Sequence, residues 1–328
     1  MVLWVKDFLI GMTKKIRLLV LVAVIAFFIW CSYWFVVSVR ATAQLISEGS
    51  FFMEQTKVVW WTVVFYATEV TPSAGIIFRW VASVLALYSA LIFAKNGSRF
   101  APAVRRKVGA ALFLEGANYL TMIPAVISGF TYPFVEDLWY YGKTPGIVVF
   151  LLNGLATLAM VVLIPLFVFK LRSKIVHDSP NGEIVKWVCL TGAAYLFVFW
   201  FVYSISWIAS LVPWSVRAQP GVEILLNPLD LASFLLTVVF LLVIVLYGWA
   251  TLIPAARRGS SPSLKRVGVI MTGLGIYFAA ILIIFFLLGG YHAHPTIWME
   301  ILGPVHNPDC WCVALIPLGL YIALSSKG

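Results

Sequence analysis

The sequence predicts an all-α integral membrane protein with eight transmembrane helices in two pseudo-symmetric four-helix units. Its composition is the first reason: 62% of the 328 residues are hydrophobic and 11% are charged. A soluble domain has roughly a quarter of its residues charged. Crossing roughly 30 Å of hydrocarbon takes about 20 mostly apolar helical residues. Backbone groups in lipid must pair internally, so long apolar runs in this chain must be helices.

The apolar runs are the second reason, because eight of them are long enough to span a bilayer. They cover residues 17–39, 73–94, 108–130, 146–169, 185–212, 229–256, 267–289 and 309–326. The residues before 17 are expected to lie at the interface. The first run is too long for the core of a signal peptide and lacks a small-residue cleavage site, so no cleaved leader is predicted.

The basic residues are the third reason, because they sort to one side of this pattern. All but five of the 23 Lys and Arg residues lie near the termini or in the loops after the second, fourth and sixth runs. The five exceptions are Arg40, Lys57, Arg79, Lys143 and Arg217. The positive-inside rule then places both termini in the cytoplasm. The net charge of +10 is therefore a topology signal.

An internal repeat predicts the two units. Residues 87–109 and 246–268 each contain Leu-Tyr, a short basic loop with Gly or Ser, and a basic pair before Val-Gly. These stretches lie four runs apart, so the two halves have the same orientation. A parallel repeat implies a pseudo-two-fold axis along the membrane normal. The predicted units are residues 1–172 and 173–328.

A second repeated pattern marks the start of each returning helix. Thr or Asn precedes Pro four times, and an acid precedes each of these pairs; the four pairs are Thr71 with Pro72, Thr144 with Pro145, Asn227 with Pro228, and Asn307 with Pro308. Thr and Asn cap helix N-termini, and Pro suits the first turn. The acids complement the helix dipole. This pattern is typical of helix starts. Alternatively, the four positive helix ends line an outer-leaflet site for an anionic or quinone-like group.

The outer loops are long and aromatic, as in residues 51–66 and 132–141, whereas the inner loops are short. Trp and Tyr prefer membrane interfaces. Such loops also suit helices that lie on the membrane or a platform for an extracytoplasmic partner. The short inner loops leave little room for a cytoplasmic catalytic domain, so we expect any chemistry outside or within the bilayer.

Glu115 is the acid placed deepest in a predicted run, about two turns from its cytoplasmic end. Asn118 and Tyr119 follow three and four residues later and share its helix face. An intramembrane carboxylate indicates a functional site, here proton transfer or proton uptake beside a quinone. The alternative is a protonated Glu115 bonded to a neighbouring helix; the partners expected for it are Asn153, Ser204 and Ser206. Arg79 is expected to snorkel outward or to pair with Glu69.

The last outer loop holds most of the metal-ligating residues. The candidate ligands are His292, His294, His306, Asp309, Cys310 and Cys312. His and Cys bind Zn or Cu, and closely spaced pairs place two ligands together. The alternatives are a purely structural loop and a redox-active thiol pair. A disulfide between Cys310 and Cys312 would be strained, because only one residue separates them. The remaining cysteines, Cys31 and Cys189, are expected to be buried apolar residues.

Several classes of function are not expected. No His lies within a predicted span, so this chain alone is not expected to hold a haem. The basic residues occupy separate short loops, which excludes a continuous nucleic-acid-binding face. The chain has no phosphate-binding loop, zinc-protease motif or serine-hydrolase elbow.

These observations favour a membrane subunit of a respiratory or energy-transducing redox complex in the plasma membrane. It would anchor an extracytoplasmic partner and exchange quinol or protons near Glu115. The architecture resembles that of quinol-interacting anchor subunits of respiratory oxidoreductases, a likeness of fold that does not fix function. Two alternatives remain: a transporter or channel with its path between the two repeats, and an extracytoplasmic metal-handling or assembly protein.

Overall fold

A computed structural model describes most of the chain: residues 14–55, 59–96, 102–124, 126–127, 130, 144–217, 228–287 and 315–325. These residues are helical apart from short turns. The elements are α2 (Lys14–Gln55), α3 (Val59–Asn96), α4 (Pro102–Leu120), α7 (Thr144–Val176), α8 (Asn181–Arg217), α9 (Pro228–Leu235), the π-helical η1 (Leu236–Phe240), α10 (Leu241–Arg258), α11 (Leu264–Leu287) and α14 (Leu315–Ser325). Helices α9, η1 and α10 follow one another without a break and together form one continuous helical segment.

Six of these helices contain a stretch long and apolar enough to cross a membrane. The stretches are Leu21–Arg40, Ala74–Ile92, Gly154–Val176, Asn181–Ile205, Leu231–Arg258 and Leu264–Ile281. The described part of α14 is shorter, at 11 residues, and α4 carries three basic residues and Glu115 among its 19. The chain is therefore a helical, multi-pass membrane protein. The count of eight spans and the duplicated unit stay predictions.

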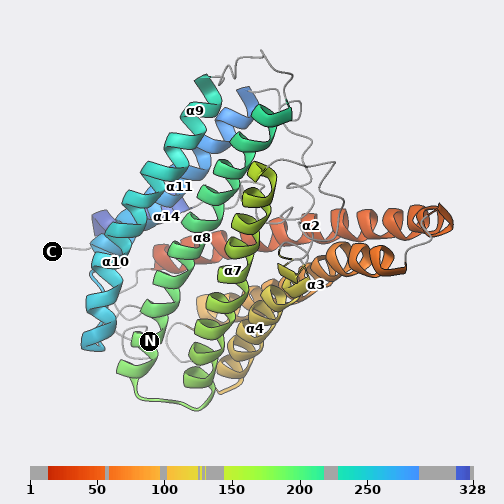
Figure 1. The fold of residues 1–328 in the computed structure, drawn as a ribbon. Helices are drawn as coiled ribbons and strands as arrows, with labels where there is room; N and C mark the ends of the chain where they lie inside the picture. The colour runs from red at the N-terminus through yellow and green to blue at the C-terminus, as the bar shows by residue number, and fades with distance from the viewer. Residues whose placement is uncertain are drawn as a thin grey trace.

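The helices pack in chain order. Each long helix lies against the next, from α2 through α3, α4, α7, α8, α10 and α11 to α14, and α14 returns to contact α2. The long helices therefore close into a ring. Figure 1 shows α2 and α3 side by side; α2 passes across α7 and α8, and both helices extend away from the others at the end where they are joined.

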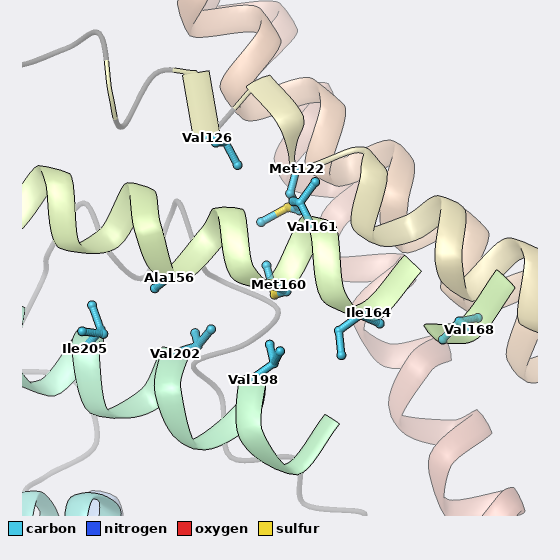
Figure 2. Packing of buried hydrophobic residues seen from close by; sticks show 10 residues of the cluster. All are labelled: Met122, Val126, Ala156, Met160, Val161, Ile164, Val168, Val198, Val202 and Ile205. Atoms are coloured by element: carbon cyan, nitrogen blue, oxygen red, sulfur yellow. The ribbon is translucent and has the colours of Figure 1, made fainter. Parts of the chain in front are cut away.

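The first hydrophobic core of the molecule forms where α7 packs between α4 and α8. Figure 2 shows Val198 and Val202 of α8 facing Met160 of α7, while Met122 approaches Val161 on the other side of the same helix. These side chains are 8% exposed or less. A second cluster joins α8, α10 and α11 around Tyr277. Its buried hydroxyl lies 3.1 Å from Thr237 Oγ1, which η1 carries.

The first outer loop differs from the expectation. Helix α2 continues to Gln55 and α3 begins at Val59, so almost all of residues 51–66 are helical. Thr71 and Pro72 lie within α3 and do not begin a helix, so that helix start is wrong.

Two of the other predicted helix starts agree with the structure. Helix α7 begins at Thr144, with Pro145 in its first turn. Helix α9 begins at Pro228, directly after Asn227. Both places follow the rule that proline suits the first turn of a helix. Asn307 and Pro308 lie outside the described residues.

Helix α4 ends earlier than the predicted run of 108–130. It stops at Leu120, and a turn occupies residues 121–122. Pro124 explains the break, because its ring clashes with the carbonyl four residues earlier and its nitrogen donates no hydrogen bond. Helix α4 begins at Pro102, before the predicted run, and Glu115 lies five residues before its last residue, Leu120.

Helices α11 and α14 approach each other closely at two glycines. A Cβ atom on Gly319 would lie 2.5 Å from the Gly268 carbonyl oxygen and 2.6 Å from the Thr272 nitrogen. Small residues four positions apart on each helix, Thr272 after Gly268 and Ala323 after Gly319, allow this contact.

Candidate functional site: a polar cluster at an apolar chamber

The cluster is built around two opposite charges on neighbouring helices. Arg79 lies on α3 within the apolar stretch Ala74–Ile92, and Glu115 lies on α4. Arg79 Nη2 is 3.6 Å from Glu115 Oε1, and the side chains are 15% and 21% exposed. A charge at this depth is stabilised only when another charge or a hydrogen bond compensates it. The ion pair supplies that compensation from within the fold.

Asn118 ties the arginine to the helix backbone. With its amide oriented to suit its neighbours, the nitrogen donates to the Gly75 carbonyl at 2.8 Å and the oxygen accepts from Arg79 Nη2 at 3.1 Å. A Cβ atom on Gly75 would lie 2.7 Å from the terminal amide atom of Asn118 that faces it. A glycine at this position therefore lets α3 and α4 approach closely enough for the bond.

Two tyrosines complete the cluster. Arg79 Nη2 donates to the Tyr119 hydroxyl at 3.2 Å. The Tyr195 hydroxyl, on α8, donates to Glu115 Oε1 at 3.3 Å. The two tyrosine rings meet edge to face with centroids 6.1 Å apart. One cluster thus joins α3 and α4 from the predicted first unit to α8 from the second.

The cluster forms part of the wall of a large chamber. The chamber has a volume of about 780 Å³ and is lined by residues of α2, α3, α4, α8, α10, α11 and α14. Apart from Arg79, Glu115, Tyr119, Tyr195 and the indole of Trp30, the described lining residues are apolar or glycine. This size is within the range of sites for drug-sized ligands.

Helical periodicity makes the apolar walls. Helix α8 contributes Gly192, Tyr195, Leu196 and Phe199, which recur at the spacing of one helix face. The face of α11 that lines the chamber is longer than that of α8 and runs from Val267 to Phe278. These twelve positions rise about 16 Å along the helix axis, so the chamber accommodates an extended apolar body.

The arrangement suits an amphiphile with one compact polar group. The polar side chains offer N–H donors, hydroxyl groups and carboxylate oxygens in one part of the wall, while the rest of the wall provides only apolar contact. Pockets for small molecules typically combine apolar walls with a few convergent polar groups.

The three residues predicted for this site lie close together. Glu115, Asn118 and Tyr119 all belong to the α4 face that meets Arg79. The sequence predicts that Arg79 snorkels outward or pairs with Glu69; the structure pairs Arg79 with Glu115. Glu115 is bonded to Tyr195 and not to Ser204, whose buried hydroxyl has no partner among the described residues. The side chains of Glu69, Asn153 and Ser206 lie outside the described set.

Two members of the cluster were missed from the sequence. Tyr195 gave no signal, because tyrosines are common in this chain and its contact with Glu115 is 80 residues away in sequence. Arg79 did give a signal, since a basic residue inside an apolar run needs a partner. The candidate metal ligands from His292 to Cys312 lie outside the described residues.

Comparisons with known proteins find no similarity: no protein-family model, no curated protein and no solved structure matches this chain.

Proposed function

We propose that this chain is a membrane subunit of a respiratory or other energy-transducing complex, and that its chamber binds a lipid-soluble substrate, a quinol. In this proposal Glu115 accepts a proton from the bound hydroxyl group, while Tyr119 and Asn118 keep Arg79 in place beside it. The extracytoplasmic partner docks on the outer loops. The protein lies in the plasma membrane with both termini in the cytoplasm.

One observation carries this proposal. The only ionisable groups among the described chamber residues are an ion pair and two tyrosines, gathered on one wall of an apolar cavity of about 780 Å³. A water-soluble substrate would find few hydrogen-bond partners along such walls. A quinol matches them, because its head group forms hydrogen bonds and its isoprenoid tail needs apolar contact.

The first experiment is purification of the native protein in mild detergent, followed by mass spectrometry of everything that accompanies it and an optical spectrum. The proposal expects bound quinone together with redox subunits that contribute haem or iron–sulfur absorption. A colourless, solitary protein without quinone would contradict it.

In an active complex, Glu115→Gln is expected to slow quinol oxidation, with Glu183→Gln as the control. Unchanged quinol oxidation and proton coupling would remove Glu115 from the proposed role.

A transporter is the second candidate. It is favoured by the position of the chamber, which helices of both predicted units line. Internal repeats commonly enclose a central path in transporters. The scarcity of polar lining residues favours a lipid-soluble cargo over an ion or a sugar. Uptake of a hydrophobic cargo by proteoliposomes that contain only this chain would support transport over the redox role.

A further inference from the structure

The ion pair suggests a role for Glu115 that is separate from proton transfer. Apolar walls make non-directional contacts, so they discriminate little between the tail of a membrane phospholipid and the tail of another amphiphile. The head group must therefore provide the discrimination. Arg79 alone would favour the wrong molecule, because a guanidinium group binds phosphate strongly and in a defined geometry.

Glu115 changes this balance through its position. Its carboxylate oxygen is 3.6 Å from Arg79 Nη2, and both side chains line the chamber. A phosphate that approached Arg79 would come close to this carboxylate. Because apolar walls provide little screening, the repulsion between the two anions would be much stronger there than in water. The formal charge of the pair is zero, so an uncharged head group meets no such penalty.

Hydrogen bonds from neighbouring residues keep the side chains of Arg79 and Glu115 side by side. Arg79 Nη2 has the Asn118 oxygen at 3.1 Å and the Tyr119 hydroxyl at 3.2 Å. Tyr195 donates to the same Glu115 oxygen that faces the arginine. These contacts come from two helices besides α3, and they keep the carboxylate beside the guanidinium group.

We infer that Glu115 is a specificity-determining residue: by neutralising Arg79, it makes the chamber accept amphiphiles with an uncharged head group and exclude anionic lipids. This inference rests on the proposed function, because it requires that the chamber binds a lipid-soluble quinone. It makes a distinct prediction, because removal of the carboxylate should change which head group is bound and not merely weaken binding.

The test uses the purified full-length chain in an uncharged detergent. A decyl-substituted benzoquinone is bound first, and its quenching of tryptophan fluorescence is recorded. Decan-1-ol and decyl phosphate, which share one tail, then compete for the site. The readout is the ratio of their half-displacement concentrations, and partitioning into micelles is the same for every variant.

We expect the ratio of half-displacement concentrations to follow the net charge of the pair at positions 79 and 115. In Glu115→Gln the ratio shifts towards decyl phosphate by about tenfold or more, the effect of one unscreened charge at this distance. In Arg79→Gln it shifts the other way. Glu115→Asp and the double variant Arg79→Gln with Glu115→Gln stay near the wild-type ratio, because the net charge is unchanged. The control Glu183→Gln removes an acid that is paired with Lys174 outside the chamber lining and leaves the ratio unchanged.

Each failure has its own meaning. If the benzoquinone does not bind the wild-type chain, the chamber is not its site, and both the proposed function and this inference are wrong. If it binds but Glu115→Gln keeps the wild-type ratio within about twofold, the inference alone is overturned. Should Glu115→Gln fail to fold, the opposite shift expected in Arg79→Gln decides the matter, and an unchanged ratio there overturns the inference.

Discussion

At the scale of single residues, the charge pair accounts for a basic side chain inside an apolar helix. Arg79 is surrounded by a carboxylate, an amide oxygen and a hydroxyl, all supplied by α4. An isolated arginine at the centre of a membrane helix costs roughly 3 kcal/mol or more. A partner held at a fixed distance removes much of that cost. We therefore expect the cluster to stabilise the fold as well as to shape the chamber.

We expect Arg79 and Glu115 to be energetically coupled. Glu115→Gln alone should lower the free energy of unfolding by about 3 kcal/mol, because it leaves a buried cation without its counter-ion. The double variant Arg79→Gln with Glu115→Gln should lose less than the sum of the single variants, with a coupling energy of about 1–3 kcal/mol. A titration with denaturing detergent, followed by circular dichroism, measures the four unfolding midpoints.

The pair of Lys174 and Glu183 is the matched control. Its atoms are closer, at 3.0 Å, but its side chains are 33% and 41% exposed. Exposed pairs contribute little because solvent screens them. Additive effects at this pair and coupling at the other would agree with the prediction. Additive effects at both pairs would mean that the pair of Arg79 and Glu115 does not stabilise the fold.

Part of this cluster could have been predicted from the sequence. Helix α3 ends at Asn96 and α4 begins at Pro102; Arg79 lies 17 residues before that end, and Tyr119 lies 17 residues after that start. Residues equidistant from a short hairpin turn lie at the same level, so the basic residue belongs beside Tyr119 and one turn from Glu115. No such rule predicts the contact of Tyr195 with Glu115, because α7 separates α4 from α8 in the chain and no short turn sets their relative level.

At the scale of elements, prolines and glycines decide where the helices end and how closely they meet. Pro124 stops α4 at Leu120 and thereby leaves Glu115 near a helix end. Gly259 ends α10 in a left-handed conformation with φ of 59°, which glycine adopts at little cost. The contact of α11 with α14 depends on Gly268 and Gly319, where side chains would separate the two backbones.

A methyl group on Gly319 should weaken the packing of α14 against α11 and so destabilise the ring of helices. In Gly319→Ala the new Cβ would lie 2.5 Å from both the Gly268 oxygen and Thr272 Oγ1, so α14 must move outward. We expect a loss of about 1–3 kcal/mol, the usual cost of overpacking. The thermal unfolding midpoint measures it. Leu320→Ala is the control, because Leu320 is 45% exposed and should change stability by no more than about 0.5 kcal/mol. Equal midpoints for the two variants would contradict a close crossing.

At the scale of the whole molecule, the ring explains how a chain this apolar forms a chamber. Each helix covers its neighbours in sequence order, and α14 closes the ring against α2. Faces directed towards lipid carry large apolar side chains, such as Val36 and Val243, which are 64% and 58% exposed. Such exposure would be unfavourable in water but suits a bilayer, where lipid tails cover these faces.

The orientation of the ring can be tested by labelling. Ser260, exposed in the turn between α10 and α11, lies among the basic residues that predict the cytoplasmic side. In a background with the four native cysteines replaced by alanine, Ser260→Cys should react with a membrane-impermeant maleimide only in inverted vesicles. Lys143→Cys, in a predicted outer loop, should react only in intact cells. The reverse pattern would overturn the predicted orientation.

The sequence by itself determined that the chain is helical and crosses a membrane several times, because hydropathy and backbone pairing in lipid are local constraints. It also placed the beginnings of α7 and α9 and directed attention to Glu115. Only the tertiary structure decided that Arg79 neutralises this acid, that Tyr195 reaches it from α8, and that a chamber lies beside them. Helical periodicity fixes which residues share a face, but the pairing of faces depends on contacts between residues far apart in the chain, which no local pattern records.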